Sequence, residues 1–256
     1  MMRVPPSDCP KFVAWSAKLD QLPSALMDRT PQGGVEKLRL AKEARDTFND
    51  YVAALIAQRR LHVADDLVSM MAASELGKQM RETELMAHNT QLLFGGAHTT
   101  AKLMGHCLIT LARHPDQRRR LRDDRSLIPQ AIEEVLRYES VLQADLGIVA
   151  EDDAEIDGVA VPEGSQVWLM LGSANRDPSR WERPDEFDIL RERKFHVGFG
   201  FGLHSCLGVN LARLEVELFL DRLLDRLPEW QMVREPEYGT NFFIRGPASI
   251  WIGKRA

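Results

Sequence analysis

One cysteine lies in a dense cluster of glycine and aromatic residues in the second half of the chain. The stretch FGFGLHSCLG, residues 199–208, places Cys206 beside three glycines, His204 and Phe199. An amphipathic helical pattern follows at once, so the sulfur is expected at the N-terminal end of that helix, where unpaired N–H groups and the helix dipole favour an anion. Glycines would let the backbone approach a flat ligand closely. The arrangement favours a thiolate at position 206.

An isolated cysteine is, however, more often a small buried apolar residue than a ligand or nucleophile. We apply that interpretation to Cys107, as helix packing, and to Cys9, as part of a connector. Three scattered cysteines are too few for a disulfide framework or a tetrahedral zinc site, which indicates a reducing compartment and predicts the cytoplasm.

The loop around Cys206 fits the pattern Phe-Gly-x-Gly-x-His-x-Cys-x-Gly at all six fixed positions, which are Phe199, Gly200, Gly202, His204, Cys206 and Gly208. It resembles the haem-ligand loop of the cytochrome P450 family. The resemblance implies that Cys206 is the proximal thiolate on the iron of haem b, where it donates electron density that helps to split an O–O bond. It also implies that His204 pairs with a haem propionate. The other haem contacts expected in this loop come from Phe199, Gly200, Leu207 and Gly208.

A second chemical candidate lies in GGAHTT, residues 95–100. The family has two small residues, any residue, an acid and then threonine here, so Gly95 and Gly96 fit and leave space above a haem. Thr99 is expected to hydrogen-bond bound oxygen and relay protons. His98 replaces the acid. It is expected either to shuttle protons near neutrality or to be an ordinary helix residue that faces away, and the sequence leaves both interpretations open.

Glu134 and Arg137 are three residues apart in a predicted helix, a spacing that usually means a solvated surface pair. Here RPDEFDILRE follows before the cysteine loop, as in the family, and its Arg191 matches the second arginine of the family's Glu-Arg-Arg triad. The resemblance implies that Glu134, Arg137 and Arg191 form a structural lock.

Helices must position these groups. Apolar residues at three-to-four spacing predict helices over residues 34–60, over about 79–113, from Pro129 onward, and over 207–224. Residues 154–172 alternate short apolar runs with Asp-Gly and Pro-Glu-Gly turns, which predicts strands, and residues 241–255 predict a terminal hairpin. The prediction is a mainly α fold with a small β portion, in a single domain over residues 1–256.

Composition narrows the classes of partner. The chain has 256 residues, 44% of them hydrophobic, which is typical of a globular core. Thirty-three basic and 38 acidic residues give a formal charge of −5 without a basic stripe, so nucleic acid is not an expected partner. No apolar run reaches the roughly 18 to 20 residues that cross a bilayer, so no membrane is expected either.

The strings ANRDP, residues 174–178, and LARLE, residues 211–215, resemble the soluble bacterial branch of the same family. One departure is Gly147, where the family commonly has an arginine that binds a propionate. Another is the start, VPPSDCPKFVAWSAKLD, which resembles the middle of a family member. The expectation is therefore the C-terminal portion of a cytochrome P450 without its N-terminal helices.

The resemblance implies a haem-thiolate monooxygenase that inserts one atom of dioxygen into an apolar small molecule. Electrons would come from NAD(P)H through ferredoxin reductase and ferredoxin. Two alternatives stay open: a truncated non-catalytic fragment or pseudoenzyme with weak or no haem binding, and a haem-thiolate enzyme that uses peroxide, which the missing acid at position 98 would suit.

Overall fold

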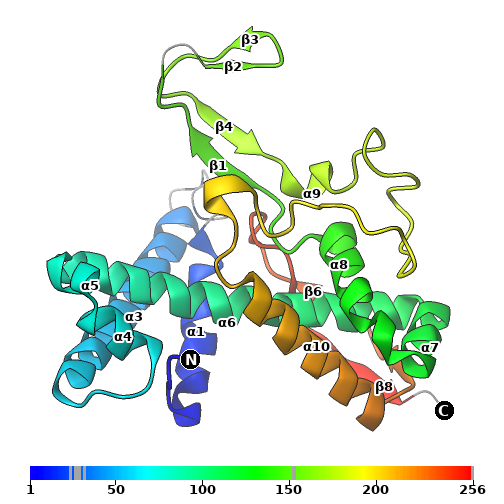
Figure 1. The fold of residues 1–256 in the computed structure, drawn as a ribbon, viewed down its shortest axis with the longest axis horizontal. Helices are drawn as coiled ribbons and strands as arrows, with labels where there is room; N and C mark the ends of the chain where they lie inside the picture. Colours follow the sequence, from blue (N-terminus) through cyan, green and yellow to red (C-terminus); the bar gives the residue numbers. More distant parts are fainter. Residues whose placement is uncertain (23–24, 26–29, 31–32, 152–153, 255–256) are drawn as a thin grey trace. The chain divides into compact units, whose positions relative to one another are not determined.

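The computed structural model of the chain describes residues 1–22, 25, 30, 33–151 and 154–254 (Figure 1). Contacts within the chain divide it into two compact units, Met1–Thr99 and Thr100–Ala256. Helix α6, Glu82–Arg113, begins in the first unit and ends in the second. The single domain expected from the sequence stays a prediction. None of the described helices is both long and apolar enough to span a membrane.

The first unit is helical. Its elements are η1 Pro6–Asp8, α1 Cys9–Leu19, α3 Gly33–Leu61, α4 Leu67–Ala73, α5 Glu75–Gln79 and the first part of α6. The helix predicted over residues 34–60 is confirmed by α3, whose Phe48 and Val52 are one turn apart and buried. Trp15 of α1 stacks on Phe48 with 5.2 Å between ring centroids. Aromatic packing thus joins α1 to α3.

The long helix α6 is confirmed, but it begins at Glu82 and not near residue 79. Met80 adopts an extended conformation after α5, which interrupts the helical path. A carboxylate oxygen of Glu84 then accepts a hydrogen bond of 2.9 Å from the backbone N–H of Arg81. That bond satisfies one of the N–H groups that a helix start leaves unpaired, and so favours a new helix at this point.

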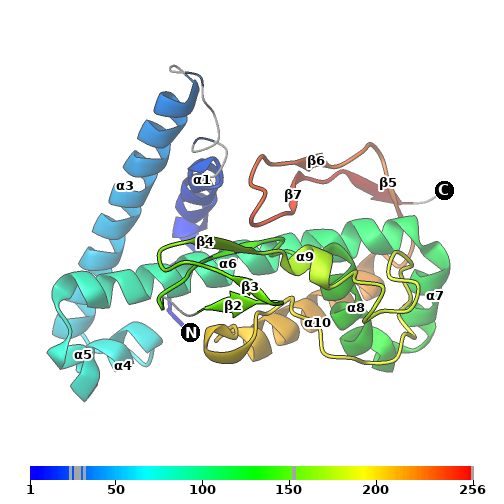
Figure 2. The same cartoon turned by 90° about the horizontal axis from the view of Figure 1, so that it is seen from above.

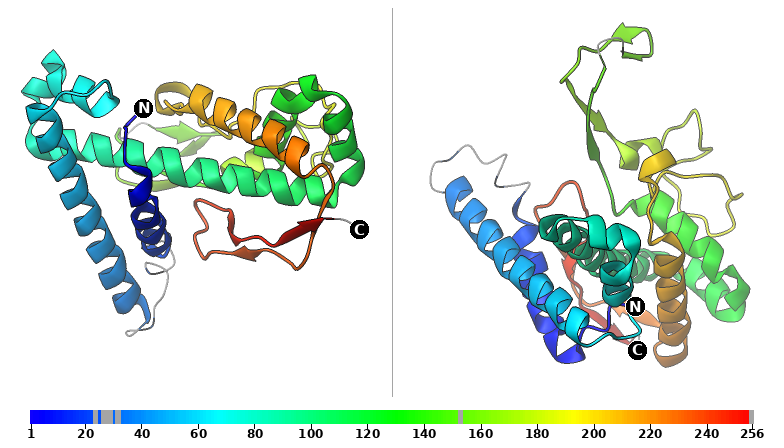
Figure 3. Two further views of the ribbon diagram at one scale, coloured as in Figure 1. Left: turned by 90° about the horizontal axis from the view of Figure 1, so that it is seen from below. Right: turned by 60° about the vertical axis from the view of Figure 1, so that its left-hand side comes forward.

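The second unit is mainly helical (Figure 3). Its helices enclose an apolar core. After α6 come α7 Pro115–Asp123, η2 Arg125–Leu127, α8 Ile128–Glu139, α9 Leu171–Ala174, η3 Gly202–His204 and α10 Val209–Arg226. Pro129 lies in the first turn of α8, as predicted, where its missing N–H has no helical partner to lose. Cys107 of α6, Ile132 of α8 and Leu220 of α10 are buried in one core cluster.

Short antiparallel ladders form the β portion of the second unit. In the described residues β1 Asp145–Ile148 pairs with β4 Gln166–Leu169, β2 Glu155–Ile156 with β3 Val159–Ala160, β5 Trp230–Met232 with β8 Ile252–Lys254, and β6 Glu237–Tyr238 with β7 Pro247–Ser249. Asp157 and Gly158 have φ angles of 49° and 78°, the left-handed values of a two-residue hairpin turn, so the Asp-Gly prediction is confirmed.

The terminal hairpin predicted over residues 241–255 is wrong. Strand β7 pairs with β6 and β8 pairs with β5, so the two segments are not partners (Figure 2 shows β5, β6 and β7). Gly246 precedes β7 and Pro247 is its first residue, so these turn-forming residues do not separate β7 from β8. The two residues between β7 and β8 form no turn. Because no reversal separates the strands, they cannot fold back on one another. Arg255 lies outside the described residues.

Candidate functional site

Two glycines in the loop before α10 adopt backbone conformations that side chains disfavour. Gly200 and Gly202 have φ angles of 73° and 65°. A Cβ on Gly200 would also lie 2.9 Å from the carbonyl oxygen of His204, closer than an ordinary contact. A Cβ on Gly202 would meet nothing within 4 Å. The loop therefore needs glycine at 200 for conformation and space, and at 202 for conformation alone.

Cys206 closes this loop. Its backbone N–H donates a hydrogen bond of 2.8 Å to the carbonyl oxygen of Phe199, which ties the two ends of the loop together. The residue is exposed, and it lies two positions before Gly208, the N-cap of α10. A Cβ on Gly208 would be 3.9 Å from the sulfur of Cys206. The thiol is thus an exposed group just before the N-terminus of an 18-residue helix, where negative charge is favoured.

Large apolar residues flank Cys206 in the sequence, and their side chains are also exposed. They are Phe201, Leu203 and Leu207, of which Leu203 has no protection from solvent in this structure. His204 is exposed at the end of η3. Phe199 packs partly against the core of the unit, and the Arg213 guanidinium lies 5.2 Å from its ring centroid. An open thiol among exposed apolar side chains would suit a flat, largely apolar cofactor that binds sulfur.

The other cysteines have different surroundings. Cys107 is fully buried, and burial raises the pKa of its thiol to about 12, so it remains neutral. Cys9 is exposed at the start of α1. All three thiols are free. In the described part of the chain, no three histidine, cysteine, aspartate or glutamate residues are grouped as a metal site.

The segment of α6 that contains Gly95, Gly96 and Thr99 belongs to the first unit. A Cβ on either glycine would meet nothing within 4 Å, so the described residues leave space on that part of the helix. The Thr99 hydroxyl donates a hydrogen bond of 2.6 Å to the carbonyl oxygen of Gly95.

His98 contacts a carboxylate at the end of α1 and a ring on its own helix. Its Nε2 atom lies 2.9 Å from a carboxylate oxygen of Asp20, which follows α1 as its C-cap. Its ring also stacks on Phe94, one turn earlier on α6, with 5.2 Å between ring centroids. Nothing in the sequence singled out Asp20, because it lies 78 residues away and has no periodic relation to His98.

Glu134, Arg137 and Arg191 are brought together in the second unit. Arg137 donates two hydrogen bonds of 2.8 Å to the Glu134 carboxylate, and Arg191 donates one of 3.1 Å. The Glu134 and Arg137 side chains are 4% and 1% exposed, so this is not a solvated surface pair. Arg137 also donates to backbone carbonyl groups of Asn175, Pro184 and Glu186. The cluster thereby ties α8 to the segment that leads to the cysteine loop.

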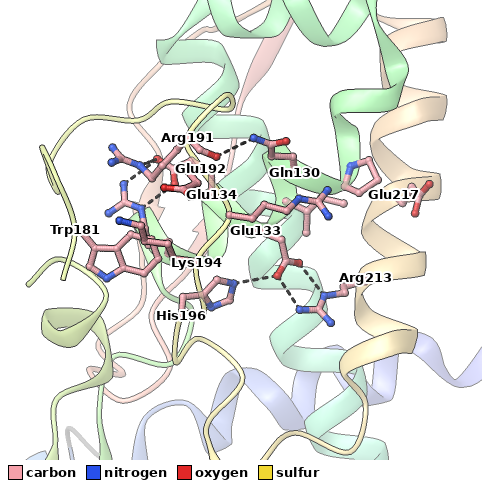
Figure 4. A pocket seen from close by; sticks show the side chains of 14 residues that line it. Gln130, Glu133, Glu134, Trp181, Arg191, Glu192, Lys194, His196, Arg213 and Glu217 are labelled. Atoms are coloured by element: carbon pink, nitrogen blue, oxygen red, sulfur yellow. Dashed lines mark hydrogen bonds and ion pairs between the residues drawn. The ribbon is translucent and has the colours of Figure 1, made fainter.

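Glu133 forms a second, only partly buried cluster next to the first (Figure 4). Arg213 of α10 donates two hydrogen bonds to its carboxylate, at 2.8 and 2.7 Å, and Nε2 of His196 lies 3.2 Å away. Burial alone would raise the pKa of Glu133, but the bonds from His196 and Arg213 outweigh it and hold the pKa at about 2. Both clusters line a pocket of about 370 Å³. Sequence reasoning missed this cluster, although the adjacent glutamates at 133 and 134 were a signal.

Asn175 connects the triad region to the cysteine loop. Its side-chain oxygen accepts a hydrogen bond of 2.9 Å from the backbone N–H of Val197, two residues before Phe199, and its amide donates to the Ser140 hydroxyl. The string ANRDP served only as a resemblance, and the structure shows what its asparagine contacts. Gly147 lies in β1 opposite Val167.

The family model described as "Cytochrome P450" matches residues 19–238. The chain belongs to the cytochrome P450 family. The mainly helical fold with small sheets is the P450 fold, as the resemblance implied.

Relatives support the same assignment. The chain is similar to cytochrome P450 107B1 of Saccharopolyspora erythraea, with 44% identity over 73% of this chain and 47% of that protein. Among solved structures it is similar to CxnD, a P450 for C–S bond formation in chuangxinmycin biosynthesis, with a TM-score of 0.87 and 35% identity over 99% of this chain and 61% of that one. It is also similar to P450BioI in complex with acyl carrier protein ligated to hexadec-9Z-enoic acid, with a TM-score of 0.84 and 35% identity over 98% of this chain and 63% of that one. The chain spans about half the length of the curated relatives it matches.

Proposed function

We propose that this P450 chain functions as a haem-thiolate monooxygenase, which inserts one atom of dioxygen into an apolar small molecule. The observation that carries the proposal is the exposed Cys206 thiol, at the end of a loop held by left-handed glycines and followed by α10. Family membership supports the cofactor, and the exposed apolar side chains around the thiol support its flat shape.

The residues of the cysteine loop would bind and orient haem b. Cys206 would be the iron ligand, and His204 would pair with a propionate. Phe199, whose ring is fixed between the core and Arg213, would pack against the flat face together with Leu207. Gly200 and Gly208 would keep the backbone close to the ligand.

On α6, Gly95 and Gly96 would leave room for a small ligand. The Thr99 hydroxyl holds its proton in the bond to the Gly95 carbonyl and can release it by rotation about the side chain. The Thr99 hydroxyl and the His98 side chain would together relay protons to the bound oxygen. When bound, haem supplies dioxygen activation with two electrons from NAD(P)H, which ferredoxin reductase and ferredoxin would deliver.

An apolar substrate is supported by the neighbouring P450BioI structure, which holds hexadec-9Z-enoic acid on its carrier protein. We place the protein in the cytoplasm, in keeping with three free cysteines.

The test is haem binding by the full chain. Haem b is added to wild type and to Cys206→Ala and Cys9→Ala, and stoichiometry and the carbon monoxide difference spectrum of the reduced protein are recorded. Cys9 is a matched control because it is also exposed and free. We expect a thiolate signature in wild type and Cys9→Ala, and none in Cys206→Ala. A signature retained by Cys206→Ala would reject the ligand assignment, and a wild type that takes up no haem would favour a non-catalytic chain.

A peroxide-using haem-thiolate enzyme is the second candidate, favoured by histidine where the family has an acid. Comparing turnover with hydrogen peroxide against turnover with ferredoxin, its reductase and NAD(P)H separates the two. Turnover with peroxide alone would favour the second candidate.

A further inference from the structure

The His98 side chain is held on two sides within the first unit. Phe94 stacks on one face of its ring, and Asp20 contacts one edge at Nε2. The side chain is only 9% exposed, and that of Asp20 is 17% exposed. Both partners therefore interact in a poorly hydrated place, where a hydrogen bond to a carboxylate is stronger than at a surface.

The contact with Asp20 decides which nitrogen of the neutral ring carries the proton. A carboxylate only accepts hydrogen bonds, so Nε2 must donate and Nδ1 presents a lone pair. The Nδ1 atom is buried and has no hydrogen-bond partner among the residues that the structure describes. An open, buried acceptor on a polar side chain costs free energy unless something uses it.

We propose that Asp20 is a positioning residue for His98. It supplies, from the C-cap position after α1, the carboxylate that the family pattern has on the long helix itself, and it holds His98 as the Nε2–H tautomer so that Nδ1 is the proton-accepting atom. This inference rests on the proposed function, because only in that reaction would the Asp20–His98 pair transfer protons next to Thr99.

The proton balance of the pair is closed. When Nδ1 takes up a proton from water, the ring becomes an imidazolium and the Asp20 carboxylate balances its charge. The same proton then passes from Nδ1 to the Thr99 hydroxyl, which gives up its own proton to the next acceptor, and the neutral Nε2–H ring returns. Aspartate itself keeps its charge throughout, so the pair is unchanged after each cycle.

Nitrogen NMR tests the geometry without haem. The full chain is labelled with 15N-histidine, and the His98 signals are assigned by their loss in His98→Gln. In wild type we expect a proton-bearing Nε2 and a bare Nδ1. Asp20→Asn keeps an oxygen acceptor of the same shape and should keep this tautomer, whereas Asp20→Ala should let the two nitrogens exchange protons. A wild-type Nδ1–H tautomer, or Asp20→Ala signals identical to wild type, would overturn the proposal.

A second measurement tests the role in the reaction. Haem-loaded wild type, Asp20→Asn and Asp46→Asn are supplied with ferredoxin, its reductase, NAD(P)H and hexadec-9Z-enoic acid as the probe. Asp46 is an exposed aspartate that forms an ion pair with its neighbour Arg45. We expect Asp20→Asn to slow NAD(P)H consumption about tenfold, with unchanged haem stoichiometry and thiolate signature, and Asp46→Asn to match wild type. An unchanged rate in Asp20→Asn would refute the positioning role of Asp20. A wild-type chain that binds no haem would contradict the proposed function, and the NMR result alone would then decide whether Asp20 fixes the His98 tautomer.

Discussion

The cysteine loop can be tested by adding one methyl group at each of three glycines. Gly200, Gly202 and Gly208 lie within nine residues of one another, yet their surroundings differ. At 200 the φ angle is 73° and a Cβ would lie 2.9 Å from a carbonyl oxygen. At 202 the φ angle is 65° and nothing lies within 4 Å. At 208 the φ angle is −85° and the nearest atom would be 3.9 Å away.

These differences predict an order of stability. Alanine in the left-handed region costs roughly 1–2 kcal/mol, so Gly202→Ala should lose about 1 kcal/mol of unfolding free energy after the smaller entropy of the unfolded chain is counted. Gly200→Ala adds a close contact with backbone, which costs about 1–3 kcal/mol more. For Gly208→Ala, a weaker N-cap and a less flexible unfolded chain should offset to within about 0.5 kcal/mol.

Urea unfolding of the three haem-free variants, followed by tryptophan fluorescence and analysed with a common slope, gives these differences as midpoint shifts. Hydrogen exchange at the Cys206 amide, which bonds the Phe199 carbonyl, reports the loop directly. The reasoning fails if Gly202→Ala costs as much as Gly200→Ala, or if Gly208→Ala is the most damaging.

Three further outcomes are expected. Glu133→Gln should make stability depend less on pH in the acid range. The pKa of Glu133 is lowered from 4.5 to about 2, so the stabilisation from its ionised carboxylate is present above pH 4.5 and is lost as pH falls through about 2. Thermal melts of both proteins across that range measure the difference, and parallel curves would contradict the prediction. Arg137→Ala should cost about 3–5 kcal/mol in chemical unfolding, because it leaves the buried Glu134 carboxylate and three carbonyl groups short of donors; a loss below about 1 kcal/mol would show a surface-like pair. Iodoacetamide should label Cys206 but not Cys107 in the native haem-free chain, and added haem should protect Cys206; mass spectrometry of the labelled peptides decides, with equal labelling of both thiols as the adverse result.

Local features of this protein were determined by the sequence. The helices α3, α6, α8 and α10 follow from apolar periodicity, and the Asp157-Gly158 turn follows from residues that accept left-handed conformations. The pattern around Cys206 could be recognised by its resemblance to the P450 loop, and the left-handed conformations of Gly200 and Gly202 arise within that same short loop. Information of this kind lies within one or two turns of the chain.

Long-range partners were decided only by the tertiary structure. Asp20 meets His98 across 78 residues and Glu133 meets Arg213 across 80, and no spacing rule joins either pair. The terminal strands show the same limit: their composition indicated β structure, but their partners were β5 and β6 and not each other. A side chain's type determines what it can bind, whereas the path of the whole chain determines what lies within reach. For that reason the thiol at position 206 could be proposed from the sequence, and the carboxylate beside His98 could not.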